Sequence, residues 1–134
     1  MSLSEPFRHA LRVYWEDTDA CGIVFYANYL KFFERARTEW LRARGVEQQA
    51  LRESTGALFV VSEARLRCVR PARLDDWLTV TVEVRHAGQA SLRIAQQAWR
   101  ATELLAEGDV RIACVDATTL RPRRFPEDVL QRTR

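Results

Sequence analysis

The sequence predicts an α+β fold in which one curved antiparallel sheet wraps around a single long helix. Two observations lead to this fold class. A short strand is followed by a long helix and then by a run of strands, unlike the alternation of strands and helices in a parallel sheet. The long helix is strongly apolar on one face, so a sheet is needed to cover it. Such a sheet leaves an edge or a face exposed, which favours assembly of several copies.

Helical spacing begins near residue 27 and continues to about residue 43. Its apolar side chains recur at offsets of three and four and therefore share one face: Tyr29, Phe32, Phe33, Ala36 and Trp40. Gly45 is expected to end this helix. A loosely alternating strand over residues 7–14 precedes it, and a second short helix over residues 47–52 follows.

Alternation of apolar with polar residues predicts the later strands. Ala64, Leu66 and Cys68 alternate with charged residues, which is typical of a half-buried strand. Pro126 and the two acidic residues after it are typical of a helix start. The remaining strands are expected near residues 78–84, 91–100 and 107–115.

The bulk properties indicate one ordinary soluble domain. A chain of 134 residues has room for one domain, which we place over residues 1–134. With 47% hydrophobic and 29% charged residues, its composition is close to that of a typical globular protein. The net charge of +3 comes from basic residues that are spread among acidic ones, so we expect a solvated surface and no nucleic-acid partner.

The cysteine pattern and the chain ends favour a cytoplasmic location. Three cysteines without a C-x-x-C pair give neither a disulfide framework nor a zinc cluster, and reduced thiols are the simpler interpretation. The first residues lack the apolar core of a secretory signal, and no apolar run is long enough to span a bilayer. We therefore expect a cytoplasmic protein with no metal.

Only residues 17–29 are dense enough in chemically useful groups to form a site. Asp17 and Asp19 lie in a loop that leads into the helix, and a helix start offers unpaired backbone N–H groups that polarise a carbonyl oxygen. A nearby carboxylate can attack the carbonyl carbon or deprotonate a water. The alternative is that either aspartate only caps a turn. Cys21 is a weaker nucleophile candidate, because no His or Lys lies near it in the sequence.

Several segments resemble the YbgC-type acyl-CoA thioesterases associated with the Tol–Pal system, which belong with the 4-hydroxybenzoyl-CoA thioesterases in the hotdog superfamily. The resemblance rests on residues 14–20 and 29–39, with further matches at 71–76, 114–116 and 121–123. It implies a hotdog fold and hydrolysis of an acyl-CoA thioester to a free acid and coenzyme A. No cofactor is implied, because coenzyme A is part of the substrate.

The resemblance also assigns roles within the loop. The second Asp of the D-x-D motif, the catalytic carboxylate of the family, is Asp19 here, whereas Asp17 supports the loop. The residue that opens the helix and gives a backbone N–H to the thioester oxygen is Tyr26. Many YbgC-type members have His at this position, whereas the 4-hydroxybenzoyl-CoA enzymes have Tyr. The Tyr therefore keeps aromatic acyl groups among the candidate substrates. The expected substrate-binding residues are Gly22, Phe25, Asn28, Tyr29, Phe33 and Phe59, although the aromatic ones also fit a core role.

Partners and rival functions follow from the same resemblance. We expect a homodimer that stacks into a homotetramer, with sites at subunit interfaces, and acyl carrier protein is a further candidate partner. Arg70, Arg73 and Arg93 are candidate contacts for the coenzyme A phosphates. Glu34 is expected to be a surface carboxylate of the helix, although its place in the turn pattern keeps it a candidate. The rivals are a hotdog hydratase or dehydratase, for which the segment supplies no His, and a non-catalytic binding module. The acyl chain, whether short, long or aromatic, is left open.

Overall fold

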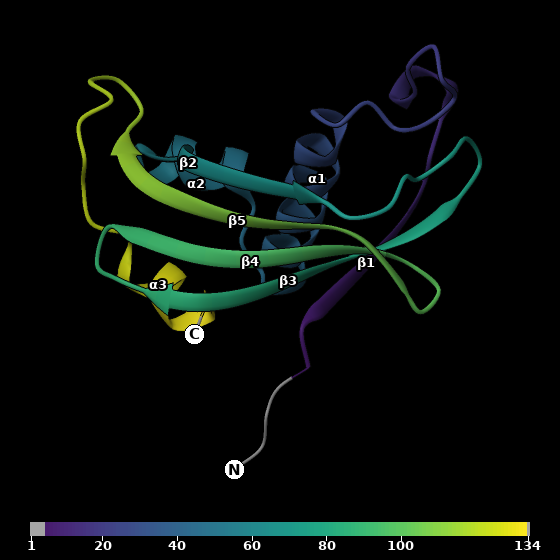
Figure 1. Ribbon diagram of the computed structural model, residues 1–134. Helices are drawn as coiled ribbons and strands as arrows, with labels where there is room; N and C mark the ends of the chain where they lie inside the picture. Colours follow the sequence, from purple (N-terminus) through teal and green to yellow (C-terminus); the bar gives the residue numbers. More distant parts are fainter. Residues whose placement is uncertain (1–4, 134) are drawn as a thin grey trace.

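The computed structural model describes residues 5–133 and confirms the predicted α+β order (Figure 1). A 3-10 turn at Trp15–Asp17 precedes the long helix. The strands are β1 (Phe7–Arg12), β2 (Ala57–Cys68), β3 (Trp77–Ala87), β4 (Ser91–Arg100) and β5 (Glu103–Asp116), and the helices are α1 (Asn28–Ala43), α2 (Gln48–Thr55) and α3 (Glu127–Thr133).

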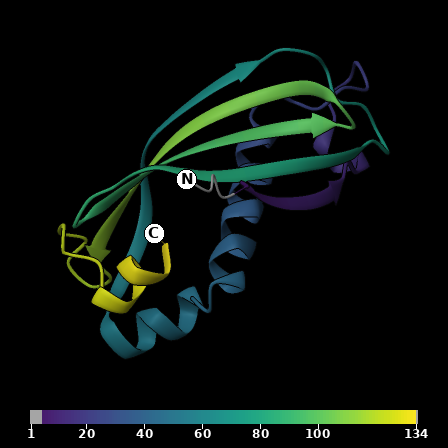
Figure 2. The same ribbon diagram turned by 90° about the horizontal axis from the view of Figure 1, so that it is seen from below.

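The five strands form one antiparallel sheet in the order β1-β3-β4-β5-β2. The sheet curves over α1, which lies along its concave face (Figure 2). Register shifts interrupt three of the strand pairs, between Val61 and Glu63, between Val84 and His86, and between Ala98 and Trp99. Such bulges bend a strand and increase its twist, which helps the sheet to curl around the helix.

Helix α1 buries the apolar face that the sequence predicts, with Leu41 added to it. Helix and sheet meet closely at Phe33, whose ring lies over Gly108 of β5. A Cβ atom at Gly108 would lie 2.5 Å from Cε2 of Phe33, so only a glycine fits beneath the ring. The phenylalanine therefore packs directly on the backbone of the sheet.

Strand β2 differs from the prediction of a half-buried strand. Ala64 and Cys68 are exposed in the single chain, and Val61 is 49% exposed. The reason is geometric, because α1 packs mainly against β1, β3 and β4, while β2 lies at the edge of the sheet. On the apolar face of its second half, Ala64 and Cys68 therefore stay exposed, while Leu66 packs against the core.

Other differences concern the ends of elements. The second helix continues to Thr55, where Gly56 ends it in the left-handed conformation with φ 76°. Strand β2 then begins at Ala57, earlier than the alternation indicates. Along residues 5–133, no helix combines the length and the apolar character that crossing a membrane requires.

Candidate active site

The loop before α1 folds back on itself and is held by its own backbone. Thr18 and Val24 form an isolated antiparallel bridge, and the N–H of Asp19 donates to the carbonyl of Ile23 at 2.9 Å. The N–H of Gly22 donates to the carbonyl of Asp19 at 3.0 Å, and Gly22 has the positive φ of 74° that this turn requires. The loop is therefore a compact hairpin whose tip contains Asp19 and Cys21.

Asp17 and Asp19 have opposite surroundings, although they lie two residues apart. Asp17 is 3% exposed, and its two carboxylate oxygens accept hydrogen bonds from the N–H of Tyr14 at 2.8 Å and from Nδ2 of Asn28 at 2.9 Å. It thereby ties the 3-10 turn to the start of α1. Asp19 is exposed, and its Oδ1 accepts a bond from the N–H of Cys21 at 2.8 Å, as in an Asx turn. Within residues 5–133 its Oδ2 accepts no hydrogen bond.

The chain enters α1 with two unpaired backbone donors. Phe25 donates its N–H to the carbonyl of Asp17 at 2.9 Å, and Asn28 donates to the carbonyl of Phe25 at 2.8 Å. Between them, the N–H groups of Tyr26 and Ala27 have no acceptor in the described chain. A helix start carries partial positive charge, so these donors suit a developing negative charge on an oxygen. The rings of Phe25 and Tyr26 pack against each other at 4.8 Å and are 43% and 63% exposed.

The loop rests on a second segment, residues 71–73. The carbonyl of Ala72 accepts from the N–H of Val24 at 2.9 Å, and Ile23 forms a bridge with Arg73. The N–H of Ala72 donates to the hydroxyl of Tyr29 at 3.3 Å. Burial raises the pKa of Tyr29, and the hydrogen bond from Ala72 acts in the opposite direction. The backbone of one segment thus holds both the loop and the first turn of α1.

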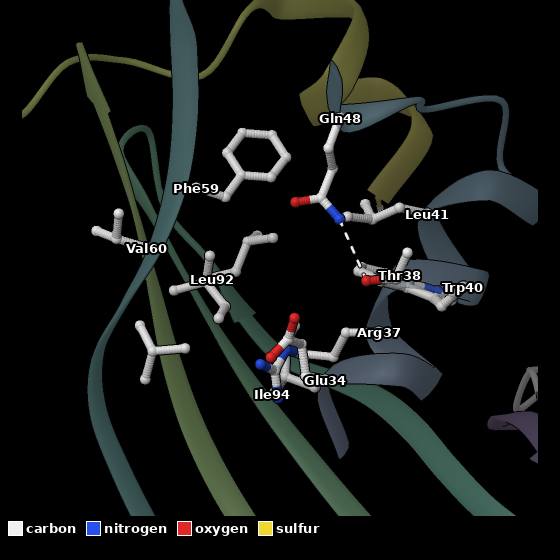
Figure 3. Close-up of a pocket in the computed structure, with 12 residues that line it drawn as sticks. Glu34, Arg37, Thr38, Trp40, Leu41, Gln48, Phe59, Val60, Leu92 and Ile94 are labelled. Carbon is white, nitrogen blue, oxygen red and sulfur yellow. Dashed lines mark hydrogen bonds between the residues drawn. The ribbon is translucent and has the colours of Figure 1, made fainter. Parts of the chain in front are cut away.

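A cavity of about 280 Å³ lies beside the second half of α1 (Figure 3). Its apolar wall combines Trp40 and Leu41 of the helix with Phe59 of β2, Leu92 and Ile94 of β4, and Ile112 of β5. Its polar side is formed by Glu34, Arg37, Thr38 and Gln48. The ring of Phe125, 5.4 Å from that of Phe59, packs against the residue that closes the cavity.

Arg37 is the half-buried cation of this cavity. Its guanidinium donates to Oε1 of Gln96 at 2.9 Å, and Gln96, only 1% exposed, donates in turn to the carbonyls of Phe33 and Thr81. Burial lowers the pKa of Arg37, while the nearby Glu34 carboxylate acts in the opposite direction. The sequence analysis missed Arg37, although its spacing from Glu34, Thr38 and Leu41 places these four residues on one helix face.

The structure separates the predicted substrate-binding residues into three groups. Gly22, Phe25 and Asn28 lie in or beside the loop, and Phe59 lines the cavity. Tyr29 and Phe33 are buried in the core, at 2% and 0% exposure, and do not line the cavity. Their direct contact with a substrate stays a prediction.

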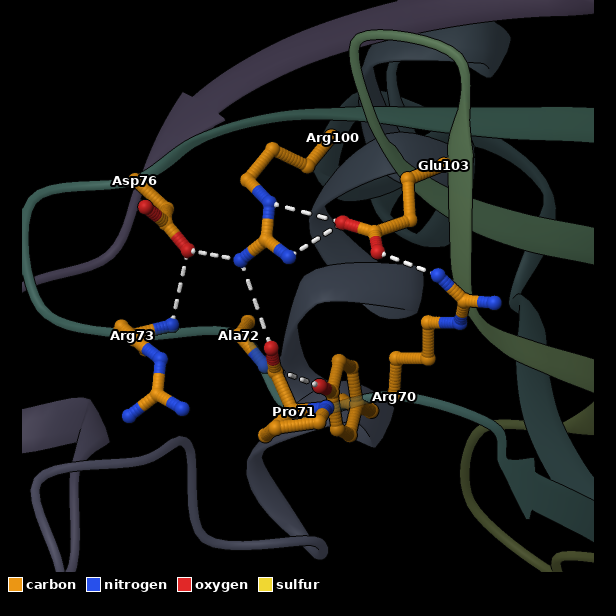
Figure 4. A network of polar contacts seen from close by, with 8 residues as sticks. Arg70, Pro71, Ala72, Arg73, Asp76, Arg100 and Glu103 are labelled. Atoms are coloured by element: carbon orange, nitrogen blue, oxygen red, sulfur yellow. Dashed lines mark hydrogen bonds and ion pairs between the residues drawn. The ribbon is translucent and has the colours of Figure 1, made fainter.

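The three arginines proposed as phosphate contacts also differ. Arg70 pairs with Glu103 at 2.7 Å, and Arg93 pairs with Asp109 at 3.0 Å. In the described chain the side chain of Arg73 forms neither a hydrogen bond nor an ion pair, and it points away from the neighbouring polar network (Figure 4). Of the three, Arg73 is therefore the one whose side chain is not already paired with a carboxylate in the described chain.

Comparison with known proteins relates this arrangement to one family. Residues 13–133 match the model of the thioesterase-like superfamily. The chain is 42% identical over 127 residues to the acyl-CoA thioesterase YbgC of Haemophilus influenzae, covering 95% of this chain and 93% of that protein. It is also 42% identical over 125 residues to the acyl-CoA thioester hydrolase YbgC of Escherichia coli O157:H7, covering 92% of each.

Solved structures agree with the sequence relatives. A probable thioesterase from Bartonella henselae superposes with a TM-score of 0.87 at 32% identity, over 91% of this chain and all of that one (100%). A 1,4-dihydroxy-2-naphthoyl-CoA thioesterase from Synechocystis gives a TM-score of 0.88 over 96% of both chains. Its 20% identity makes it evidence for the hotdog fold alone.

Proposed function

Because this chain belongs to the thioesterase-like superfamily and is a YbgC-type acyl-CoA thioester hydrolase, we propose that Asp19 and the start of α1 together cleave the thioester. The observation that carries the proposal is that, within residues 5–133, an exposed Asp19 oxygen without a hydrogen bond lies at the tip of the hairpin and two unpaired backbone N–H groups follow its second strand. The products are a free acid and coenzyme A.

In the proposed reaction the thioester oxygen binds the N–H of Tyr26, with that of Ala27 beside it. These donors stabilise the negative charge that forms on the oxygen when the carbonyl carbon is attacked. Asp19 either attacks that carbon and expels the coenzyme A thiolate, giving a mixed anhydride that water hydrolyses, or removes a proton from the attacking water. Either route requires only this carboxylate, these donors and water, so we propose no metal and no cofactor.

The acyl group is proposed to lie in the cavity beside α1. Phe59 and the apolar residues of β4 and β5 offer a surface from which an acyl chain displaces water. The coenzyme A portion would remain outside, where the guanidinium of Arg73 has donors for a phosphate. We place the protein in the cytoplasm, consistent with its three cysteines, all of which are free.

A second copy of the chain is proposed to complete the assembly. Strand β2 is an edge strand, and Val61, Ala64 and Cys68 are exposed on it in the single chain. Edge-to-edge pairing of two copies would join their sheets and pair the free backbone groups of this edge. Light scattering after size exclusion should give the mass of a dimer or of a tetramer built from dimers, and a monomer at micromolar concentration would contradict the proposal.

The decisive experiment measures release of free thiol from acetyl, butyryl, hexanoyl, palmitoyl, benzoyl and 4-hydroxybenzoyl-CoA. The wild type is compared with Asp19→Asn and with the control Asp128→Asn, which changes an exposed carboxylate at the start of α3. Hydrolysis that the control retains and Asp19→Asn loses supports the proposal. Near-normal hydrolysis by a folded Asp19→Asn variant would show that the assignment is wrong.

A further inference from the structure

The segment Pro71–Arg73 lies between the candidate active-site loop and an arginine on the sheet. On the side of the loop, Ala72 uses both backbone groups, accepting from Val24 and donating to Tyr29. These bonds hold the loop two residues before Tyr26, whose N–H is the proposed oxyanion donor. A displacement of Ala72 would therefore also move Val24 and Tyr29, and with them the N–H of Tyr26 that lies between them in the sequence.

On the other side, the segment is held by Arg100, near the end of β4 (Figure 4). One terminal nitrogen of Arg100 donates to the carbonyl of Pro71 at 3.3 Å and to Oδ2 of Asp76 at 2.6 Å. The same Oδ2 accepts from the N–H of Arg73 at 2.8 Å. The residues on both sides of Ala72 are thus bound to Arg100, one directly and the other through a carboxylate.

Arg100 is itself oriented by Glu103. Its Nε donates to Oε1 of Glu103 at 3.1 Å, and its second terminal nitrogen bonds the same oxygen. Arg70 occupies the other oxygen of Glu103. The side chains of Arg100, Asp76 and Glu103 are only 30%, 22% and 32% exposed, so the network is more protected from solvent than an ordinary surface ion pair.

We propose that Arg100 is a positioning residue for thioester hydrolysis, which holds Pro71–Arg73 so that Asp19 and the N–H of Tyr26 keep their reacting geometry. The inference rests on the function proposed above. Its geometric basis is that a planar guanidinium donates in three directions at once, to Pro71, Asp76 and Glu103. A single ammonium group cannot reproduce that fork.

The test compares Arg100→Gln, Arg100→Lys and Asp76→Asn with the control Arg85→Gln, which removes an exposed arginine paired with Glu83 on β3. A displacement of about 1 Å costs on the order of 10²-fold in rate, so kcat of Arg100→Gln should fall about 10- to 100-fold. KM should rise by a smaller factor than kcat falls, because the residues that line the cavity are untouched and only Arg73 shifts with the segment. Arg100→Lys should remain impaired, Asp76→Asn should show a smaller loss, and the control should match the wild type.

Two further readouts distinguish positioning from a general structural role. In the Asp19→Asn background, Arg100→Gln should lower the residual rate by a smaller factor than in the wild type, because only the N–H of Tyr26 is left to be positioned. Hydrogen exchange at the N–H of Val24 should become faster in Arg100→Gln and stay unchanged in Arg85→Gln. This exchange measurement needs no substrate, so it tests the positioning role even if the proposed hydrolysis fails.

Three outcomes would overturn the inference. One is a folded Arg100→Gln variant whose kcat and Val24 exchange both equal those of the wild type. Another is full recovery of kcat in Arg100→Lys, which would indicate that only the positive charge matters. The third is a loss of rate that multiplies with that of Asp19→Asn, which would place the action of Arg100 outside this geometry.

Discussion

The two ends of α1 present two different kinds of surface. At its start, the loop before the helix is held by backbone hydrogen bonds, while the side chains of Phe25 and Tyr26 extend into solvent. Along its second half, the helix contributes side chains to a cavity whose opposite wall comes from β2, β4 and β5. The first surface depends on where the main chain lies, and the second depends on which side chains line it.

This difference suggests that, in the proposed reaction, the loop breaks the thioester bond and the cavity selects the acyl chain. Groups that act through the main chain tolerate side-chain substitution, so the proposed bond-breaking step should not depend on which side chain stands at position 26. Groups that line a cavity change its volume and polarity with each substitution. Changes at the loop should therefore alter kcat, and changes at the cavity should alter which acyl chain is preferred.

The largest effect is expected at Asp19. Replacing it with Asn removes the carboxylate needed as nucleophile or base, so kcat should fall by about 10²- to 10⁴-fold. The melting temperature should stay close to that of the wild type, because the Asn side-chain oxygen can still accept from the N–H of Cys21. Steady-state kinetics and calorimetry on the same sample check both expectations, and a large loss of stability would contradict the second.

Asp17 should show the opposite behaviour. Asp17→Ala leaves the N–H of Tyr14 and the amide of Asn28 without their acceptor, at a cost of about 1–2 kcal/mol for each of these part-buried groups. We expect the free energy of unfolding to fall by about 2–4 kcal/mol in urea titrations. If stability is unchanged, the two aspartates are not divided between support and chemistry as their contacts indicate.

The cavity can be altered without changing the loop. Thr38→Phe adds a ring at a half-buried position on the polar side of the cavity. Because this ring competes with the acyl group for space, kcat/KM for hexanoyl and benzoyl-CoA should fall about tenfold or more relative to acetyl-CoA. Thr38→Ser is the matched control and should keep the wild-type preference. An equal loss for every substrate would place the acyl group elsewhere.

The smallest expected effect is a pH dependence of stability that arises from Glu103, at the start of β5. Hydrogen bonds from Arg70 and then from Arg100 lower the pKa of Glu103 below its ordinary value of 4.5. A carboxylate with a lowered pKa stabilises the fold above its unfolded pKa, and the stabilisation is lost as the pH falls through the folded pKa. The difference in melting temperature between wild type and Glu103→Gln should therefore narrow below about pH 4.5. A constant difference down to pH 3 would contradict this.

Periodicity predicted much of the fold, because burial of one face leaves a direct trace in the spacing of apolar residues. It was wrong about β2 for an instructive reason. Alternation at Ala64 and Cys68 shows which face of the strand is apolar, but it does not show what covers that face. In the single chain Leu66 packs against the core, but Ala64 and Cys68 on the same face stay exposed.

The candidate site was predictable only where it is local in sequence. Asp19 and Tyr26 lie in one short motif, so spacing and family resemblance sufficed to name them. The cavity combines Arg37 with Leu92, Ile94 and Ile112, and the support network joins Asp76 to Arg100. These residues meet only because the strands pair in a particular register, which composition and spacing do not specify.

The contact between Phe33 and Gly108 links two positions that lie far apart along the chain. Since no Cβ fits beneath the ring, the residues at positions 108 and 33 are expected to change together. In related sequences a larger residue at 108 should be accompanied by a smaller one at 33, and in redesign Gly108→Ala should be tolerated only together with a change such as Phe33→Leu. Covariation at this pair would thus report how closely the helix approaches the sheet in each member of the family.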